Sequence, residues 1–220
     1  MERLTSISIV GLLIVLAIIL VSMILHEIAH GLVAYWLGDD TAKANGRLSL
    51  NPLKHLDPIT SFALPVVLYL MGGPIFGGAK PVPINTRNLK GGVWGMALVA
   101  IVGPLTNFIL AFVSFLIGYW TGNLTSGFGI NGIPGVIFYE LVTINLGFGI
   151  FNLLPIPPLD GSRVIYAIAP DFLRRIMEAM EQFGIWIVMI LVFLGGSLFS
   201  AFMTGATTNI LQFFYWLVGG

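Results

Sequence analysis

The stretch ISIVGLLIVLAIILVSMILHEIAHGLVAYW, residues 7–36, decides the fold. It is longer than the roughly 20 apolar residues that a helix needs to cross the hydrocarbon core of a bilayer. Its only acidic, basic or histidine side chains are His26, Glu27 and His30, which lie together near its carboxyl end. The stretch therefore predicts a membrane-spanning helix that carries a polar group within the membrane.

The composition of the whole chain agrees with a membrane protein. Of the 220 residues, 57% are hydrophobic and 9% are charged, whereas soluble domains carry about 25% charged residues. Ten basic and ten acidic residues balance to a net charge of +0, and the basic residues form no stripe, so nucleic acid is not an expected partner. Because the chain has no cysteine, disulfides, thiolate metal sites and a cysteine nucleophile are excluded.

The amino-terminal apolar run is also compatible, at first sight, with a cleaved signal peptide. The hydrophobic region of a signal peptide spans about 7–15 residues and ends at a small-residue cleavage site. The run in this chain continues from Ile7 to Trp36 without such a site. We therefore expect an uncleaved membrane span.

Further segments are long and apolar enough to cross the membrane. Gly92–Trp120 and Ile133–Leu154 both qualify, and Phe183–Phe202 is a fourth candidate. The segment Ala206–Val218 is apolar but shorter, and fits either a short span or a helix at the membrane interface. The sequence thus predicts an all-α polytopic membrane protein that forms a single domain over residues 1–220, with a core at 7–168 and C-terminal helices at 171–219.

Residues 59–76 are apolar but are interrupted by proline and glycine. Lys and Arg lie in the connections 38–58, 77–92 and 161–182, and none lies in Thr121–Gly132. The positive-inside rule places all three basic connections in the cytoplasm only if 59–76 enters and leaves on one side. This favours a re-entrant segment and an amino terminus outside, with an ordinary additional span as the alternative.

The polar connections contain turn residues and alternating patterns. Gly38–Pro58 has turn dipeptides on both sides of Arg47–Leu50, which predicts a short strand or hairpin. Lys80–Ile84 is also expected to be extended. Pro170–Gln182 predicts a short amphipathic helix, whose solvent-facing residues are Arg174, Arg175, Glu178 and Glu181.

The HEIAH segment has the spacing of a metal site. On a helix, His26 and His30 lie one turn apart on the same face, so both imidazoles can reach one ion. In HExxH sites the glutamate, here Glu27, is the general base. The alternative is a polar patch that closes a helix end. Because ionisable groups cost about 2.5–3.5 kcal/mol each at the centre of a span, a divalent cation that compensates them is the better explanation.

A catalytic zinc site takes three protein ligands and leaves one position open. His55 is the remaining histidine, but it lies in a polar loop and is expected to be solvated. Asp160 follows the point where prolines break the third span, so the backbone can turn its carboxylate back towards the first helix. By itself, Asp160-Gly161 also fits an ordinary turn at a membrane exit.

Three motifs occur in order along the chain: HEIAH at 26–30, Gly103-Pro104-Leu105-Thr106-Asn107, and the run Asn152-Leu153-Leu154-Pro155 to Leu159-Asp160-Gly161. In this the chain resembles the site-2 protease family of intramembrane zinc metalloproteases, over residues 7–168. Each motif alone is weak to moderate evidence, whereas the ordered triple is strong. The order of spans in this family also requires residues 38–91 to begin and end on one side of the membrane.

The resemblance implies roles for individual residues. His26, His30 and Asp160 would hold one Zn²⁺ per chain, and Glu27 would activate the attacking water. Asn152 would help to hold the substrate or the developing oxyanion, with a helix-end cap as the alternative. Gly103 and Asn107 are expected to serve close packing between helices.

The resemblance also implies an activity and a location. The expected function is cleavage of peptide bonds in or near transmembrane segments of membrane-anchored proteins, in a prokaryotic cell membrane with the site towards the cytoplasm. Candidate strand edges at Arg47–Leu50 and Lys80–Ile84 would bind the substrate by strand addition, or would simply cover the site. No PDZ or CBS module and no span before the HExxH helix is recognisable, so a minimal family member is expected.

Two other functions fit the same residues less well. A metal or proton transporter would also use intramembrane His, Glu and Asp, but the chain has no convincing inverted repeat. A catalytically silent binding protein would have no need to retain Glu27. The sequence gives no oligomeric state.

Overall fold

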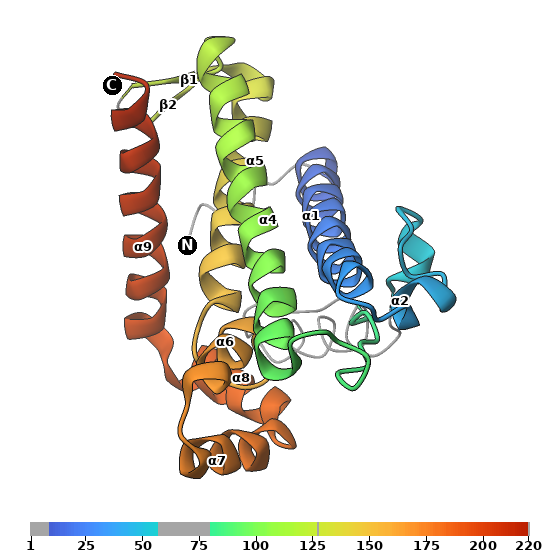
Figure 1. Ribbon diagram of the computed structural model, residues 1–220. Helices are drawn as coiled ribbons and strands as arrows, with labels where there is room; N and C mark the ends of the chain where they lie inside the picture. The colour runs from blue at the N-terminus through green and yellow to red at the C-terminus, as the bar shows by residue number, and fades with distance from the viewer. Residues whose placement is uncertain (1–8, 57–79, 127, 220) are drawn as a thin grey trace.

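Three long apolar helices form the centre of the molecule in the computed structural model, which describes residues 9–56, 80–126 and 128–219 (Figure 1). They are α1 (Ile9–Trp36), α4 (Gly92–Trp120) and α5 (Gly132–Asn152). Among the described residues, these are the three helices whose length and hydropathy suffice to cross a membrane. The predicted fold class and the three principal spans are therefore confirmed.

Helix α4 is the central element of this group. It packs against both α1 and α5, and its buried positions include Ala97, Ala100, Gly103 and Ala111. Small side chains allow helix backbones to approach closely in a membrane, where no hydrophobic force drives helices together. The close packing sets α4 directly beside the HEIAH turn of α1.

The carboxyl end of α1 and the amino end of α4 lie on the same side of the molecule. The backbone N–H of Lys90 donates to the carbonyl of Leu37 at 2.8 Å, which ties the two ends together. The connection between these helices therefore begins and ends on one side, as the distribution of charge requires. The segment 59–76, predicted to be re-entrant, lies outside the described residues.

The expected strand or hairpin in Gly38–Pro58 is wrong for the described part of that connection. Instead it forms the short helix α2 (Thr41–Ala44) and the 3₁₀ turn η1 (Pro52–Lys54). The Asn45-Gly46 turn ends α2, because the N–H of Arg47 donates back to the carbonyl of Ala42 at 2.9 Å. The turn thus closes a helix and does not join two strands.

The described part of the chain forms its small sheet at the opposite end of the molecule. Strands β1 (Leu124–Thr125) and β2 (Gly129–Ile130) pair antiparallel, with Leu124 opposite Ile130 and Thr125 opposite Gly129. This hairpin joins α4 to α5 (Figure 1). Nothing in the alternation of the sequence predicted it, because each strand has only two residues.

Four helices follow α5: α6 (Asp160–Ile168), α7 (Asp171–Glu181), α8 (Gly184–Leu194) and α9 (Gly196–Leu217). The amphipathic helix expected at Pro170–Gln182 is α7. A continuous span at Phe183–Phe202 is wrong, because Gly196 adopts a positive φ of 43°. A left-handed residue cannot continue a right-handed helix, so the chain turns between α8 and α9.

The apolar segment Ala206–Val218 belongs almost entirely to α9. This helix has 22 residues, which at 1.5 Å per residue gives a length of about 33 Å. It packs along α4 and α5 (Figure 1) through a buried cluster that includes Phe115 of α4 and Phe214 of α9. The cluster makes α9 a fourth long member of the bundle and not a loosely attached interfacial helix.

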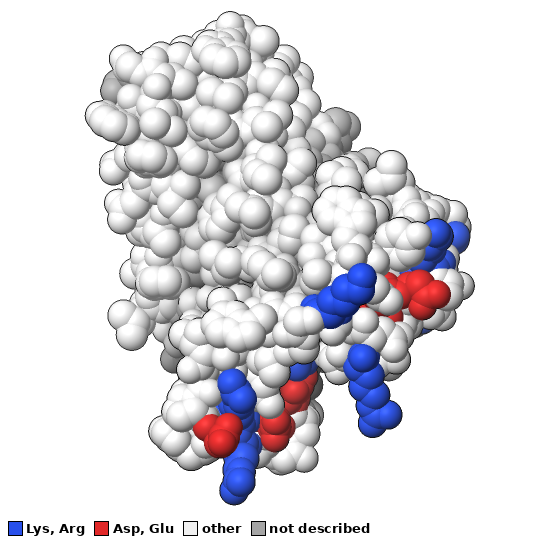
Figure 2. Space-filling view, in the orientation of Figure 1, with Lys and Arg blue, Asp and Glu red and all other residues white. Residues whose placement is uncertain are grey.

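Charged side chains gather at one end of the molecule. Figure 2 shows blue and red residues over the region of α2, α6 and α7, and none over the upper part of the bundle in this view. The surface without charges is suited to contact with lipid and the charged surface to contact with water, because exposed charges are costly in hydrocarbon.

Candidate metal centre

His26 and His30 lie on one face of α1, at the side that packs against α4. Both are buried, with 8% and 6% of their surface exposed. Their Nε2 atoms are 3.0 Å apart, as the i, i+4 spacing on a helix allows. The two imidazoles therefore point at a common position between the helices.

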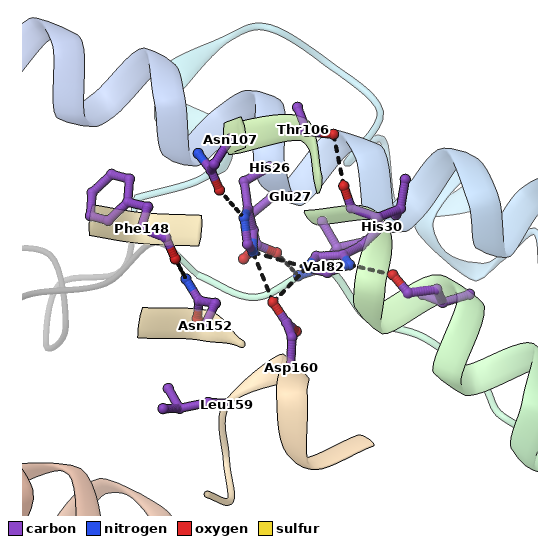
Figure 3. A network of polar contacts seen from close by, with 12 residues as sticks. His26, Glu27, His30, Val82, Thr106, Asn107, Phe148, Asn152, Leu159 and Asp160 are labelled. Atoms are coloured by element: carbon purple, nitrogen blue, oxygen red, sulfur yellow. Dashed lines mark hydrogen bonds and ion pairs between the residues drawn. The ribbon is translucent and has the colours of Figure 1, made fainter. Parts of the chain in front are cut away.

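Asp160 reaches the same position from a different part of the chain. Helix α5 ends at Asn152, and the proline-rich segment that follows turns back so that Asp160 begins α6. Its Oδ2 atom lies 3.1 Å from His26 Nε2 and 3.4 Å from His30 Nε2. The three predicted ligands are thus brought together (Figure 3).

The outward-facing ring nitrogens of the two histidines both lie against oxygen atoms. His30 Nδ1 is 2.7 Å from the carbonyl of Val99, and His26 Nδ1 is 2.6 Å from Oδ1 of Asn107. A carbonyl oxygen only accepts hydrogen bonds, so each neutral imidazole carries its proton on Nδ1. The lone pairs of both Nε2 atoms are then directed at Asp160 and at each other.

This arrangement fits a cation in the centre. Three lone-pair atoms within 3.4 Å of each other would repel, and the buried Oδ2 of Asp160 has no hydrogen-bond donor among the described residues. Ligand atoms bound tetrahedrally at about 2.0 Å are separated by about 3.3 Å, which agrees with the observed spacing. Two imidazoles and one carboxylate are a donor set that zinc accepts, with a fourth position left open.

Gly103 of α4 forms the wall behind the two imidazoles. A Cβ atom at this position would lie 2.4 Å from His30 Nε2 and 2.7 Å from His26 Cε1, far inside van der Waals contact. The histidines can occupy their positions only because residue 103 has no side chain. The Gly-Pro-x-x-Asn motif therefore supplies both a close approach at Gly103 and a hydrogen-bond partner at Asn107.

Glu27 lies beside the group and is half-buried. Its Oε2 accepts a hydrogen bond of 2.8 Å from the backbone N–H of Val82 (Figure 3). Val82 belongs to the segment that leads into α4. We call residues 80–90 the strap. One carboxylate oxygen is fixed by the strap, which leaves Oε1 as the second acceptor of Glu27.

Two buried charged residues hold the strap in place. The guanidinium of Arg47 donates to the carbonyls of Lys54, Lys80 and Pro81. The Asp39 carboxylate accepts hydrogen bonds from the backbone N–H of Asn85 at 2.7 Å and from the Asn88 side chain at 3.3 Å. Neither Arg47 nor Asp39 was singled out in the sequence, because a charge in a polar loop is usually solvated.

The expected strand edges at Arg47–Leu50 and Lys80–Ile84 are not strands. Pro81 and Pro83 have no backbone N–H, and the N–H groups of Lys80 and Val82 donate to His55 and Glu27. The His55 carbonyl and the Glu27 carboxylate therefore accept the hydrogen bonds that a sheet partner would have accepted.

The expectation that His55 is solvated is also wrong, because its side chain is fully buried. Its Nε2 lies 2.6 Å from the Ser49 carbonyl, and its own carbonyl accepts from Lys80 N–H at 2.8 Å. His55 is a structural residue under the strap and is not part of the His–His–Asp group.

Asn152 is the last residue of α5, and its side-chain N–H donates to the Phe148 carbonyl of the same helix at 3.0 Å. No contact joins it to the His–His–Asp group among the described residues, and Figure 3 places it to one side of Asp160. Asn107 links α4 to α1 through His26 and to α5 through Asn145. It joins helices, as expected, and also touches a candidate ligand.

The fold and the site together define a class: a polytopic membrane protein with a His–His–Asp group whose two buried histidines lie on an HExxH helix. The sequence model of peptidase family M50 matches residues 130–196. YwhC of Bacillus subtilis, named as a candidate zinc metalloprotease, is 37% identical over 204 residues, which cover 89% of this chain and 88% of YwhC. The chain therefore belongs to peptidase family M50, the site-2 protease family, and is a zinc metalloprotease.

Other similar proteins are also named as zinc metalloproteases. Rip2 of Mycolicibacterium smegmatis, also named as a candidate zinc metalloprotease, is 30% identical over 195 residues, 87% of this chain and 71% of Rip2. A zinc metalloprotease of Methanocaldococcus jannaschii is 27% identical over 151 residues, 69% of this chain and 33% of that protein. No solved structure matches the chain.

Proposed function

We propose that this protein is an intramembrane zinc endopeptidase that cleaves peptide bonds in or near the transmembrane segments of membrane-anchored proteins. The observation that carries the proposal is the convergence of His26, His30 and Asp160 at one buried point among apolar helices long enough to span a membrane. These three side chains would hold one Zn²⁺ per chain. A protease site at this depth has transmembrane segments as its natural substrates.

Glu27 is assigned as the general base. Bound zinc would polarise the substrate carbonyl and lower the pKa of a bound water to about 7. Glu27 follows His26 in the chain, and the N–H of Val82 orients its carboxylate. In the proposed reaction Oε1 of Glu27 takes a proton from the attacking water and later gives it to the leaving amine.

The substrate must present an unwound segment. A helix hides its carbonyls in its own hydrogen bonds, so cleavage requires local unfolding near the site. Because the backbone donors of Lys80 and Val82 are already engaged, we assign the strap to covering the site and orienting Glu27, and not to strand addition. Asn152 remains the candidate for holding the substrate carbonyl with its second amide hydrogen.

The charge distribution supports a location of the metal centre near the cytoplasmic face of a prokaryotic cell membrane. The charged end of the molecule carries the basic connections (Figure 2), and the positive-inside rule assigns such connections to the cytoplasm. The uncharged hairpin between α4 and α5 would then lie outside.

The test uses protein purified in detergent and a membrane-anchored reporter whose transmembrane segment contains glycine and proline. Wild type is expected to cleave the reporter and to contain one zinc per chain. Glu27→Gln is expected to retain zinc and to lose cleavage by about 10²-fold or more, the usual contribution of a general base. Glu140→Gln, which removes a half-buried carboxylate of α5 away from the site, is the matched control.

Normal cleavage by Glu27→Gln would overturn the assigned mechanism. Full zinc occupancy in Asp160→Ala, together with normal activity, would remove Asp160 from the ligand set. Both measurements are made on the same preparations, and thermal melting of each variant identifies a loss of folding, since loss of zinc alone is the expected result for Asp160→Ala.

A further inference from the structure

A buried chain of hydrogen bonds runs from the candidate metal centre across three helices. Asn107 of α4 contacts His26 Nδ1 with its Oδ1, at 2.6 Å, and donates through Nδ2 to Asn145 Oδ1 at 3.0 Å. Asn145 of α5 donates through Nδ2 to Ser22 Oγ of α1 at 2.9 Å. Asn107 and Asn145 are fully or almost fully buried, and Ser22 is 2% exposed.

The donor and acceptor atoms along this series of hydrogen bonds are fixed at Asn145, the end away from the metal centre. Asn145 Nδ2 also lies 2.9 Å from the backbone carbonyl of Leu141, and a carbonyl can only accept. The amide nitrogen of Asn145 must therefore face Leu141, and its oxygen must face Asn107. Asn107 in turn must present its nitrogen to Asn145 and its oxygen to His26.

The two histidines differ in how their proton is placed. His30 Nδ1 faces the backbone carbonyl of Val99, which is an acceptor in any circumstance. His26 Nδ1 faces a carboxamide, which offers either an acceptor or a donor after a 180° rotation. The orientation of Asn107 therefore needs a fixed partner, and Asn145 is that partner.

We propose that Asn145 is a positioning residue for the metal centre: it fixes the orientation of Asn107, and so keeps the Nε2 lone pair of His26 available to a cation. The inference rests on the proposed zinc site. Asn145 belongs to none of the three sequence motifs and touches none of the three candidate ligands. Partners of a ligating histidine that fix its tautomer typically change metal affinity by about 10–100-fold when they are removed.

Removal of Asn145 has a defined consequence. Asn107 is then free to rotate and to present its N–H to His26 Nδ1, which moves the ring proton to Nε2. A protonated Nε2 cannot bind a metal ion. Asn145→Ala is expected to weaken zinc binding about 10–100-fold, and Ser22→Ala, which removes one of two acceptors of Asn145, is expected to weaken it less.

The experiment measures the zinc affinity of the purified 220-residue chain by competition with a chromogenic chelator, without any substrate. Thr143→Val is the matched control, because Thr143 lies on α5 and, within the described part of the chain, its hydroxyl bonds to the Tyr139 and Glu140 carbonyls of its own helix. Its zinc affinity is expected to equal that of wild type. Thermal melting of each variant identifies loss of folding.

A second substitution separates positioning from a general structural role. Asn107→Asp replaces the carboxamide with a carboxylate that accepts from either oxygen, so its orientation no longer matters. In the Asn145→Ala background Asn107→Asp is expected to raise zinc affinity at least 10-fold. In the wild-type background the new carboxylate places an oxygen atom opposite Oδ1 of Asn145, and the two oxygen atoms repel. There the substitution is expected to raise zinc affinity by less than in the Asn145→Ala background, or to lower it.

The outcomes are distinct. Unchanged zinc affinity in both Asn145→Ala and Asn145→Leu overturns the inference, as does an equal effect of Asn107→Asp in the two backgrounds. Wild-type protein that binds no zinc overturns the metal centre itself. Zinc binding that follows the expected pattern supports the role of Asn145 even where Glu27→Gln retains cleavage, so the two proposals fail separately.

Discussion

Gly103 shows how strongly one missing side chain governs the candidate metal centre. A methyl group at this position would lie 2.4 Å from His30 Nε2, and both imidazoles are held from behind by Val99 and Asn107. Gly103→Ala is therefore expected to displace the histidines and to lower zinc affinity about 10-fold or more. Metal analysis after purification measures the effect.

Gly147→Ala is the control for Gly103→Ala. Gly147 is also a helical glycine, on α5, and a Cβ atom there meets nothing within 4 Å among the described residues. Because alanine is the better helix former, this variant should be as stable as wild type and should bind zinc normally. Equal zinc affinity in the two alanine variants would contradict the steric role of Gly103.

Some residues of the candidate site could be predicted from the sequence and others could not. His26, Glu27 and His30 were recognised from the HExxH motif and the apolar stretch around it, because a helix brings side chains four residues apart onto one face. Asp160 needed the family resemblance, since about 130 residues of chain and a tertiary turn separate it from His30. His55 and Asn145 were beyond reach: whether a single polar residue is solvated or buried depends on contacts that only the fold creates.

At the scale of elements, the strap links Arg47, which lies outside the bundle, to Glu27 beside the metal centre. Arg47→Met removes the guanidinium that bonds to the carbonyls of Lys80 and Pro81, beside the N–H of Val82. Cleavage is expected to fall about 10-fold because Glu27 loses its fixed orientation, whereas zinc content is expected to remain that of wild type. Kinetics with the reporter and metal analysis give the two readings.

Arg174→Met provides the comparison for Arg47→Met. Arg174 likewise bonds to backbone carbonyls, those of Tyr166 at 3.0 Å and Ala167 at 3.1 Å, but it joins α7 to α6. Its loss is expected to leave Glu27 oriented and cleavage near the wild-type rate. An equal loss of cleavage in both variants would mean that Arg47 acts on general stability.

Asp39 makes the attachment of the strap dependent on pH. Burial raises the pKa of the Asp39 carboxyl, but hydrogen bonds from Thr41, Asn85 and Asn88 together lower it by more, so that the pKa lies below the ordinary 3.8. Since the folded pKa is depressed, the stabilisation is fully present above about pH 4 and is lost as the pH falls through the folded value.

The expected result is a difference between wild type and Asp39→Asn that shrinks in acid. At pH 7 the variant should be less stable by about 1–3 kcal/mol, the cost of leaving buried donors unpaired. At pH 3 the gap should be smaller, because the Asp39 carboxyl of the unfolded chain, whose pKa is higher than that of the folded protein, is then protonated and the unfolded state gains stability. Denaturant unfolding in detergent at both pH values measures it, and a constant gap would contradict the role of the charge.

At the element scale, the sequence predicted long helices better than short ones. A run of about 20 apolar residues has one stable solution in a membrane, a helix that satisfies its own backbone. The positive φ at Gly196 that separates α8 from α9 leaves no mark on hydropathy. The two-residue strands β1 and β2 and the short helix α2 depend on local hydrogen bonds and had no clear pattern.

In the view of Figure 2 the charged side chains lie at one end of the molecule, and this distribution predicts its orientation in the membrane. Because the chain has no cysteine, single cysteines can report it. Ser126→Cys, in the exposed hairpin loop, is expected to react with a membrane-impermeant maleimide in intact cells. Arg175→Cys, exposed on α7, is expected to react only after lysis. The reverse labelling pattern would contradict the proposed cytoplasmic position of the metal centre.

The hydrogen bond between Lys90 N–H and the Leu37 carbonyl has a consequence for how such proteins diversify. A connection that returns to its point of departure is a closed loop, so its length can change without reversing the direction of any later helix. Insertions between His55 and Lys80, which are joined by a hydrogen bond of 2.8 Å from the Lys80 N–H to the His55 carbonyl, would leave the bundle, its topology and the contact of the strap with Glu27 intact. This loop is therefore the position at which one hydrolytic core can be adapted to different substrates.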